Sequence, residues 1–328
     1  MGSVVHVIRR VFIQSGVLSL IGAALLLLIA LPSAAMAENR LLIVLSEKYR
    51  AYSEVATAIQ TALSEKKSPL VVNVIDVSEI SNGGLPTPSP NLVVAVGVRA
   101  AKAVASLEGH PPVLNLLLPR QSFERLVRSS GKSESRSYSA IYFDQPYGRQ
   151  FDLIRQILPG REQVGVLFGE STKETMAYLA NPARQAHFQL RMKGISSQDE
   201  LIPFLKALLA ESDVLLAVPD PAVFNSTNIQ GILLTTYRYD DPVVAFSPAY
   251  VKAGALAAVY STPSQIGTEA GGVIQKALSG KKIILPPPQY PNEFSVSINY
   301  QVARSLGIAI ESEAAVYEKL KRSSEQKP

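Results

Sequence analysis

Polar residues that directly follow apolar runs are the side chains of this sequence best suited to chemistry. Ser46 and Tyr49 follow the run LLIVL, and Gly97 and Val98 follow LVVAV. A tyrosine offers a stacking face and a hydroxyl, and the free N–H groups of a helix starting after Gly97 suit an anionic or carbonyl group. Structural roles compete with these: we favour a helix cap for Ser46, and Gly97 equally suits a strand-to-helix turn.

The same pattern recurs in the second half of the chain, where polar residues follow four further apolar runs. A ligand in the crevice of a parallel sheet lies at such strand ends. Asp144 and Asn225 also suit helix caps, and the segments around Gly169 and Asp220 also suit plain loops. The residues expected to contact a ligand are Ser46, Tyr49, Gly97, Val98, Asp144, Gln145, Gly169, Glu170, Asp220, Asn225, Ser247 and Tyr250.

Residue types needed for catalysis or metal binding are sparse. The sequence has no cysteine, which excludes thiol catalysis, cysteine metal sites, disulfides and a lipid-bearing cysteine. His110 and His187 fall in different predicted halves without metal-ligand neighbours. None of the motifs G-x-S-x-G, G-x-x-x-x-G-K-[ST], G-x-G-x-x-G or H-E-x-x-H occurs. We therefore expect no catalytic residue, no metal and no cofactor.

The N-terminal residues predict export. Arg9 and Arg10 precede an apolar stretch over 17–31, and Ala35-Met36-Ala37 is an A-x-A cleavage pattern. We interpret residues 1–37 as a secretory signal cleaved between Ala37 and Glu38, which places the mature chain in the periplasm. The alternative is an uncleaved anchor helix, because the apolar stretch is long enough to reach across a bilayer.

The remaining sequence predicts an α/β fold with two parallel-sheet domains. Its 328 residues suffice for two domains, and the net charge of +5 is too small for a nucleic-acid-binding surface. Short apolar runs alternate with stripes of helical spacing in two consecutive series. The expected strands are 41–45, 70–77, 92–96 and 113–118, then 139–143, 163–168, 213–218, 242–247 and 255–260, with 187–193 as a further candidate.

The late segment 242–278 predicts that the chain returns between two lobes. It crosses two apolar runs and two breaks, at Ser-Pro and Thr-Pro, before a long amphipathic stretch. Lobes tied by several crossings hinge about a cleft at the strand ends. We expect lobe 1 to comprise 38–142 plus 249–262, lobe 2 to comprise 143–248 plus 263–310, and 311–328 to form a polar C-terminal tail.

Several stretches together resemble a known family. NLVVAVGVRAAKAVA (91–105), SAIYFDQPYGRQFDLIRQILPGREQVGVLFG (139–169), DVLLAVPDPAVFNSTNIQGILL (213–234), PVVAFSPAYVKAGALAAVYSTPSQIGTEAGGVIQKALSG (242–280) and FSVSINYQVARSLGI (294–308) are similar to periplasmic binding proteins of type 1. The resemblance is to the ABC-transporter substrate-binding group that includes aromatic-amino-acid binders. It implies two Rossmann-like lobes, solute binding in the cleft, no cofactor and no catalysis.

One departure from the family bears on the ligand. Family members often carry charged residues in the last region that clamp an amino acid, whereas Ser247, Pro248 and Tyr250 occupy the corresponding turn without an acid. The loop SEKYR (46–50) also lacks a paired acceptor and donor. These two segments argue against an amino-acid ligand, and from them we expect a weakly charged, aromatic or apolar molecule instead.

Three functions remain open from the sequence. The first is an exported protein that captures a small organic ligand and presents it to the permease of an ABC importer. The second is a periplasmic sensor whose closed form contacts a receptor kinase or a TonB-dependent transporter. The third is a periplasmic α/β enzyme, which fold alone does not dismiss.

Overall fold

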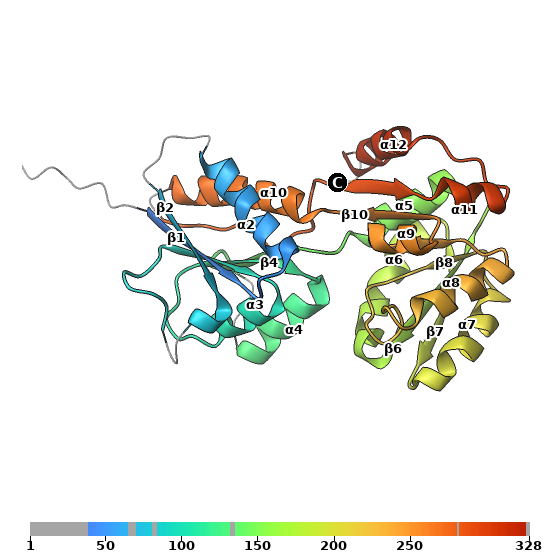
Figure 1. Cartoon of the computed structure of the whole chain (residues 1–328), viewed down its shortest axis with the longest axis horizontal. Helices are drawn as coiled ribbons and strands as arrows, with labels where there is room; N and C mark the ends of the chain where they lie inside the picture. The colour runs from blue at the N-terminus through green and yellow to red at the C-terminus, as the bar shows by residue number, and fades with distance from the viewer. Residues whose placement is uncertain (1–38, 65–69, 81–83, 132–134, 281, 326–328) are drawn as a thin grey trace, which may run out of the picture. The chain divides into compact units, whose positions relative to one another are not determined.

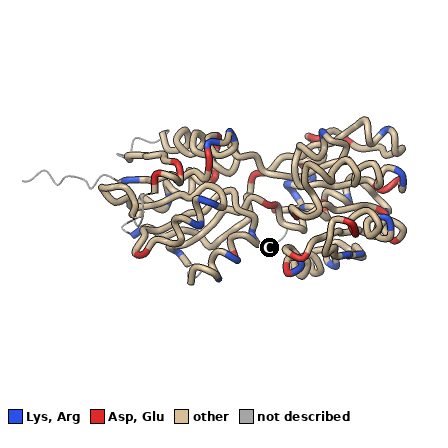
Figure 2. Tube along the Cα trace, turned by 60° about the horizontal axis from the view of Figure 1, so that its bottom comes forward, with Lys and Arg blue, Asp and Glu red and all other residues tan. Residues whose placement is uncertain are grey.

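The computed structural model describes residues 39–64, 70–80, 84–131, 135–280 and 282–325. The expected signal segment, 1–37, lies outside the described residues. Within these ranges no helix combines the length and apolar character needed to cross a membrane. Lysines and arginines are interspersed with acids along the described trace (Figure 2), as the modest net charge predicts.

The first half of the chain builds a five-stranded sheet. Its strand order is β2-β1-β3-β4-β5, and the pairs β1–β3, β3–β4 and β4–β5 are parallel. The strands are β1 (Asn39–Leu45), β2 (Leu70–Asp76), β3 (Leu92–Val96), β4 (Val113–Leu118) and β5 (Tyr138–Tyr142). The helices between them are α2 (Arg50–Ser64), α3 (Val98–Ala105) and α4 (Arg120–Ser130), with a short turn η1 (Val77–Glu79).

Alternate residues of β1 pack against helices on opposite faces of this sheet. Leu41 and Ile43 join the core with α2, whereas Leu42 and Val44 join the core with α3 and α4. Every residue of β3, β4 and β5 is buried. A parallel sheet covered on both faces requires such continuous apolar runs, which is why the sequence revealed these strands.

The second half builds a six-stranded sheet with the order β11-β10-β9-β8-β6-β7. Only the pair β10–β11 is antiparallel among its described pairs. The strands are β6 (Gln163–Gly169), β7 (Gln189–Ile195), β8 (Val214–Leu216), β9 (Val243–Ala245), β10 (Ala257–Tyr260) and β11 (Ser295–Ile298). Around them lie α5 (Tyr147–Ile157), η2 (Glu170–Met176), α6 (Ala177–Gln185), η3 (Gln198–Glu200), α7 (Leu201–Leu209), α8 (Ile229–Arg238), α9 (Pro248–Ala253), α11 (Tyr300–Ser305) and α12 (Glu313–Glu325) (Figure 1).

Two segments lie in the opposite lobe from the one expected. β10, within 249–262, pairs with β9 and β11 of the second sheet. The helix α10 (Pro263–Leu278), expected in lobe 2, packs along α2 on the first sheet (Figure 1). Gly267 allows this close approach, because a Cβ there would lie 2.7 Å from the Cβ of Ala58. A stripe of helical spacing shows that a helix packs on a sheet but not on which one.

The C-terminal segment also differs from the expected polar tail. Residues 313–325 form α12, and Val316 and Leu320 are buried in the core that α5 and β11 share. Two apolar residues four apart are enough to anchor one face of a helix. The remaining charged residues of α12 mask this stripe in the sequence.

Candidate functional site

A small pocket joins residues that follow strands of both sheets. Pro119, Arg120 and Gln121 line it after β4, Asp144 and Tyr147 line it after β5, and Thr175, Tyr178, Pro219 and Tyr290 complete it. Its free volume is ≈ 20 Å³, which is room for about one water molecule. The two sets of strand ends are therefore closely apposed here.

Asp144 is the residue of this pocket that the sequence analysis had singled out. Its Oδ1 accepts the backbone N–H of Arg120 at 2.8 Å. The residue before Arg120 is Pro119, whose side chain makes no cap bond, so Asp144 caps α4 from another strand end. Burial raises the pKa of the Asp144 carboxyl to about 6. The pocket thus holds a carboxyl group whose charge changes near neutral pH.

Arg120 supplies a cation beside this carboxyl group. Its Nε donates to Oε1 of Glu124 at 2.6 Å, and its guanidinium lies 4.3 Å from the ring centroid of Tyr178. The hydroxyl of Tyr178 donates to Oε2 of the same Glu124 at 3.0 Å. A guanidinium over an aromatic face is held by the ring quadrupole. Arg120 and Glu124 on α4 therefore both contact Tyr178, which lies on α6 in the second half of the chain.

Aromatic rings and one hydroxyl form the rest of the wall. Burial raises the pKa values of Tyr147 and Tyr290, so both phenols stay neutral and can donate hydrogen bonds. The ring of Tyr290 lies 5.2 Å from that of Tyr142 in an edge-on arrangement. The hydroxyl of Thr175 is buried without a hydrogen-bond partner among the described residues. A buried hydroxyl without a partner is costly, and a bound ligand would relieve that cost.

The expected site residues after β1 and β3 do not line this pocket. The hydroxyl of Ser46 donates to the carbonyl of Val96 at 2.8 Å and accepts the N–H of Ala100 at 2.9 Å. Gly97 has φ 86°, and a Cβ there would lie 2.6 Å from Oγ of Ser46. Gly97 thus makes the strand-to-helix turn considered for it, whereas Ser46 caps the start of α3 and not the helix that follows it in the chain.

Tyr49 and Val98, the other expected residues of this region, are solvent-exposed. The exposed fraction is 64% for Tyr49 and 37% for Val98. Their contact with a ligand stays a prediction.

Several expected residues of the second half hold its loops together. The carboxylate of Asp220 accepts the N–H of Gly169 at 2.6 Å and that of Ala222 at 2.8 Å. Asn225 Oδ1 accepts the N–H groups of Thr227 and Asn228, both at 2.9 Å, and so closes the turn before α8, whose N-cap residue is Asn228. These groups shape the strand-end loops.

The remaining expected residues of the second half lie on or beside short helices. Glu170 is exposed and pairs with Lys173 at 3.5 Å. Ser247 precedes α9, and the hydroxyl of Tyr250 donates to the carbonyl of Phe224 at 2.9 Å. The Tyr250 ring packs 4.8 Å from that of Phe246. Tyr250 is thus half-buried in packing.

Along the described residues the chain crosses between the two sheets three times: after β5, after β10, and in the segment before β11 that contains Pro291 and Glu293. Gln145 lies on the first of these crossings. It is 3% exposed, and its Nε2 donates to Oγ of Ser261 at 2.7 Å. The Ser261 hydroxyl donates to the carbonyl of Glu293 at 2.5 Å. Arg149 Nη1 donates to Oε1 of Gln145 at 2.5 Å and to the carbonyl of Pro291 at 3.1 Å. Gln145 therefore joins all three crossings and does not line the pocket.

A match to a family model shows which class of protein this chain belongs to. Residues 73–320 match the family described as ABC transporter substrate binding protein. The chain belongs to this family. The family and the fold are those of substrate-binding proteins, as the sequence resemblance predicted.

Individual relatives of this substrate-binding protein are distant. It is 22% identical, over 224 residues, to a tyrosine-binding protein of Clostridioides difficile (strain R20291), which is 66% of this chain and 63% of that protein. The match therefore spans less than two thirds of the relative's length.

Solved structures confirm the two-lobed fold. A ligand-free, open substrate-binding protein with adhesive properties from Clostridium difficile matches with a TM-score of 0.68 at 18% identity, covering 84% of this chain and 96% of that one. An ABC domain in complex with L-Trp from Streptococcus pneumoniae matches with a TM-score of 0.59 at 18% identity, covering 86% and 98%.

Sequence reasoning missed most of the pocket of this substrate-binding protein. Pro119 and Arg120 follow the apolar run VLNLLL, so the rule that found Asp144 also finds them when applied to β4. Thr175 lies within the 3₁₀ helix η2, which has no apolar period, and Tyr178 lies just after it. Tyr290 lies in an irregular segment, and no local pattern marks it.

Proposed function

We propose that this substrate-binding protein captures an amino acid with an aromatic side chain and delivers it to an ABC importer. The observation that supports this most directly is the placement of Asp144, Arg120 and three tyrosines around one pocket at the strand ends of both lobes. The tyrosine-binding relative and the L-Trp complex of a structural neighbour support the same ligand class.

The polar groups of the pocket complement both charges of an α-amino acid. In its ionised form, the Asp144 carboxylate can accept hydrogen bonds from an ammonium group. Arg120 can donate to a carboxylate, a pairing that charge strengthens. The rings of Tyr147, Tyr178 and Tyr290 can pack against an aromatic side chain. The charged groups of the site are those of Arg120 and Asp144. A doubly charged ligand therefore replaces the weakly charged one that the turn 247–250 had led us to expect.

Ligand entry requires the lobes to separate, because ≈ 20 Å³ of free space cannot hold an amino acid. A ligand that then contacts both lobes favours the closed form by its differential contacts. Arg120 and Asp144 belong to one side of the pocket, and Thr175 and Tyr178 to the other. The closed form is what a permease would distinguish from the open one.

The cellular setting follows from the same proposal. Proteins of this family are usually periplasmic or extracellular, and we propose that residues 1–37 direct this chain to the periplasm. We also propose that the ligand is released chemically unchanged. The partner would be the membrane-spanning permease of an importer.

Isothermal titration tests the ligand class. The mature chain, 38–328, is titrated with L-Trp, L-Tyr and L-Phe, and with tyramine and phenylpropionate, which each lack one of the two charges. We expect binding of at least one aromatic amino acid and at least tenfold weaker binding of its singly charged analogues. Binding of none of the amino acids, or equal binding of the analogues, contradicts the proposal.

A matched pair of variants locates the site. Asp144→Asn keeps the size and the acceptor for the Arg120 N–H but loses the charge, so it should weaken amino-acid binding by roughly ten- to a hundredfold. Glu211→Gln removes an exposed carboxylate outside the pocket and should leave affinity unchanged. Equal effects of the two changes would place the ligand elsewhere.

A further inference from the structure

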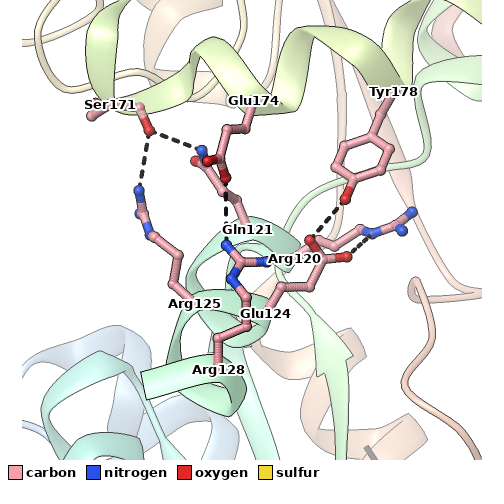
Figure 3. A network of polar contacts seen from close by, with 8 residues as sticks. All are labelled: Arg120, Gln121, Glu124, Arg125, Arg128, Ser171, Glu174 and Tyr178. Atoms are coloured by element: carbon pink, nitrogen blue, oxygen red, sulfur yellow. Dashed lines mark hydrogen bonds and ion pairs between the residues drawn. The ribbon is translucent and has the colours of Figure 1, made fainter. Parts of the chain in front are cut away.

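A band of polar contacts lies beside the pocket and joins α4 to η2 and α6 (Figure 3). The side chains of Gln121 and Arg125 both donate to the backbone carbonyl of Ser171, at 2.8 and 3.1 Å. Farther along α4, Arg128 Nη2 lies 3.4 Å from Oε2 of Glu174. Each of these contacts has one partner on α4 of the first lobe and one on η2 of the second.

The geometry of this band favours a role in closing the lobes. The carbonyl oxygen of Ser171 on η2 accepts hydrogen bonds from two side chains of α4, and the Arg128–Glu174 ion pair joins the same two elements. Tyr178, held by Glu124 and Arg120, continues this band toward the pocket. All of these groups separate when the lobes part, because each contact has one partner on each lobe.

We propose that these α4–η2 contacts are a latch that favours the closed form before ligand binds. The second half of the inference, that the latch raises ligand affinity, rests on the proposed function. For a ligand that is held in the closed form, the apparent dissociation constant equals the intrinsic one divided by the fraction of protein that is closed. Contacts that raise the closed fraction therefore strengthen binding without touching the ligand.

Arg128 and Glu174 offer the cleanest test of this latch. Neither lines the pocket, and their side chains are 59% and 81% exposed, so substitution leaves the core intact. Exposed ion pairs contribute little individually, so each charge reversal, which also introduces repulsion, should change the closed fraction by roughly two- to fivefold. The pair Glu170–Lys173 is a matched control, because both residues lie on η2 within one lobe.

Spin-label distance measurements on ligand-free protein report closure directly. The chain has no cysteine, so Lys102→Cys on α3 and Lys206→Cys on α7 place one label on each lobe without background. We expect Arg128→Glu and Glu174→Arg each to shift the distance distribution away from that of the parent protein. The double reversal should restore it, and the reversal of both Glu170 and Lys173 should not change it.

Salt concentration provides an independent measurement on the unaltered latch. Raising ionic strength from about 0.01 to 1 M shortens the screening length from about 30 to 3 Å. The parent protein should shift toward the distribution of the single reversals, whereas the single reversals, in which like charges repel, should shift in the opposite direction.

Binding measurements then separate the latch from the proposed function. With an aromatic amino acid that binds, each single reversal should weaken affinity roughly two- to fivefold, mainly through faster dissociation, and the double reversal should recover it. Unchanged distances in the single variants, or a double reversal that does not recover, overturn the latch. Shifted distances together with no binding of any aromatic amino acid support the latch and overturn the proposed ligand.

Discussion

The side-chain amide of Gln145 donates a hydrogen bond of 2.7 Å to the hydroxyl of Ser261, although 116 positions separate the two residues. One residue lies on the first crossing between the sheets and the other on the second. The hydroxyl of Ser261 donates a hydrogen bond to the backbone carbonyl of Glu293 on the third crossing, and Arg149 contacts both Gln145 and Pro291. The three crossings are thus joined by one buried polar network, and we expect them to move together.

Removing the hydroxyl at the centre of this network should destabilise the protein. Ser261→Ala leaves the Gln145 amide and the Glu293 carbonyl without their partner, and a buried polar group left unsatisfied costs about 1–3 kcal/mol. Urea unfolding measures the change. Ser264→Ala, an exposed position on the following helix, serves as the control and should change stability by less than about 0.5 kcal/mol. Equal effects of the two substitutions would contradict the network.

The stability of the protein should depend on pH through Asp144. Burial raises the pKa of its carboxyl from 3.8 to about 6 in the folded state. The folded protein thus holds this proton more tightly than the unfolded chain, and the contribution to stability is fully present below pH 3.8 and lost as pH rises through 6.

Asp144→Asn removes this titration while keeping an acceptor for the N–H of Arg120. Wild type should lose this contribution as pH rises from 4 to 7 and the variant should not. The free energy of unfolding of the variant, relative to that of wild type, should therefore rise by on the order of 2 kcal/mol between pH 4 and pH 7. Urea unfolding across that range measures the difference. Parallel profiles for the two proteins would show that burial does not govern this carboxyl group.

The contact between α10 and α2 should depend on Gly267 and not on its neighbour Gly272. A Cβ at 267 would meet the Cβ of Ala58 and the carbonyl of Val55, each at 2.7 Å, whereas nothing lies within 4 Å of a Cβ at 272. Gly267→Ala should therefore destabilise by about 1–3 kcal/mol. Gly272→Ala should stabilise by up to about 1 kcal/mol, because alanine favours the helix. Thermal unfolding compares them, and a tolerated Gly267→Ala would contradict the packing described.

The tyrosines at 49 and 250 should respond differently to truncation. Tyr250 packs on Phe246 and donates to the carbonyl of Phe224, so Tyr250→Ala should lower stability by about 2–4 kcal/mol. Tyr49 is 64% exposed, and Tyr49→Ala should leave the melting temperature nearly unchanged. Ligand titration of the Tyr49 variant then tests the contact predicted for it. Weakened binding at unchanged stability would support a contact at Tyr49, and unchanged affinity would remove it from the site.

The sequence by itself determined the two α/β series and the approximate positions of their strands, except β11, which it did not predict. Strands buried on both faces must be continuously apolar, so LVVAV and QVGVLF were evident without any tertiary information. The same local rule pointed to Asp144, because a polar residue after a buried strand marks the edge where the crevice opens. It also selected Ser46 and Asp220, which turned out to hold strand-end loops.

The tertiary structure alone decided which sheet received β10 and α10 and which side chains share the pocket. Local periodicity reports how an element is buried but carries no information about its partner. The helix α10 packs on α2 because Gly267 and Gly271 lie opposite Ala58 and Ala62, and only the three-dimensional structure shows this match. Tyr178 and Tyr290 reach Arg120 from segments far away in the chain. Their meeting depends on how the crossings place one lobe against the other, and that is a property of long-range packing.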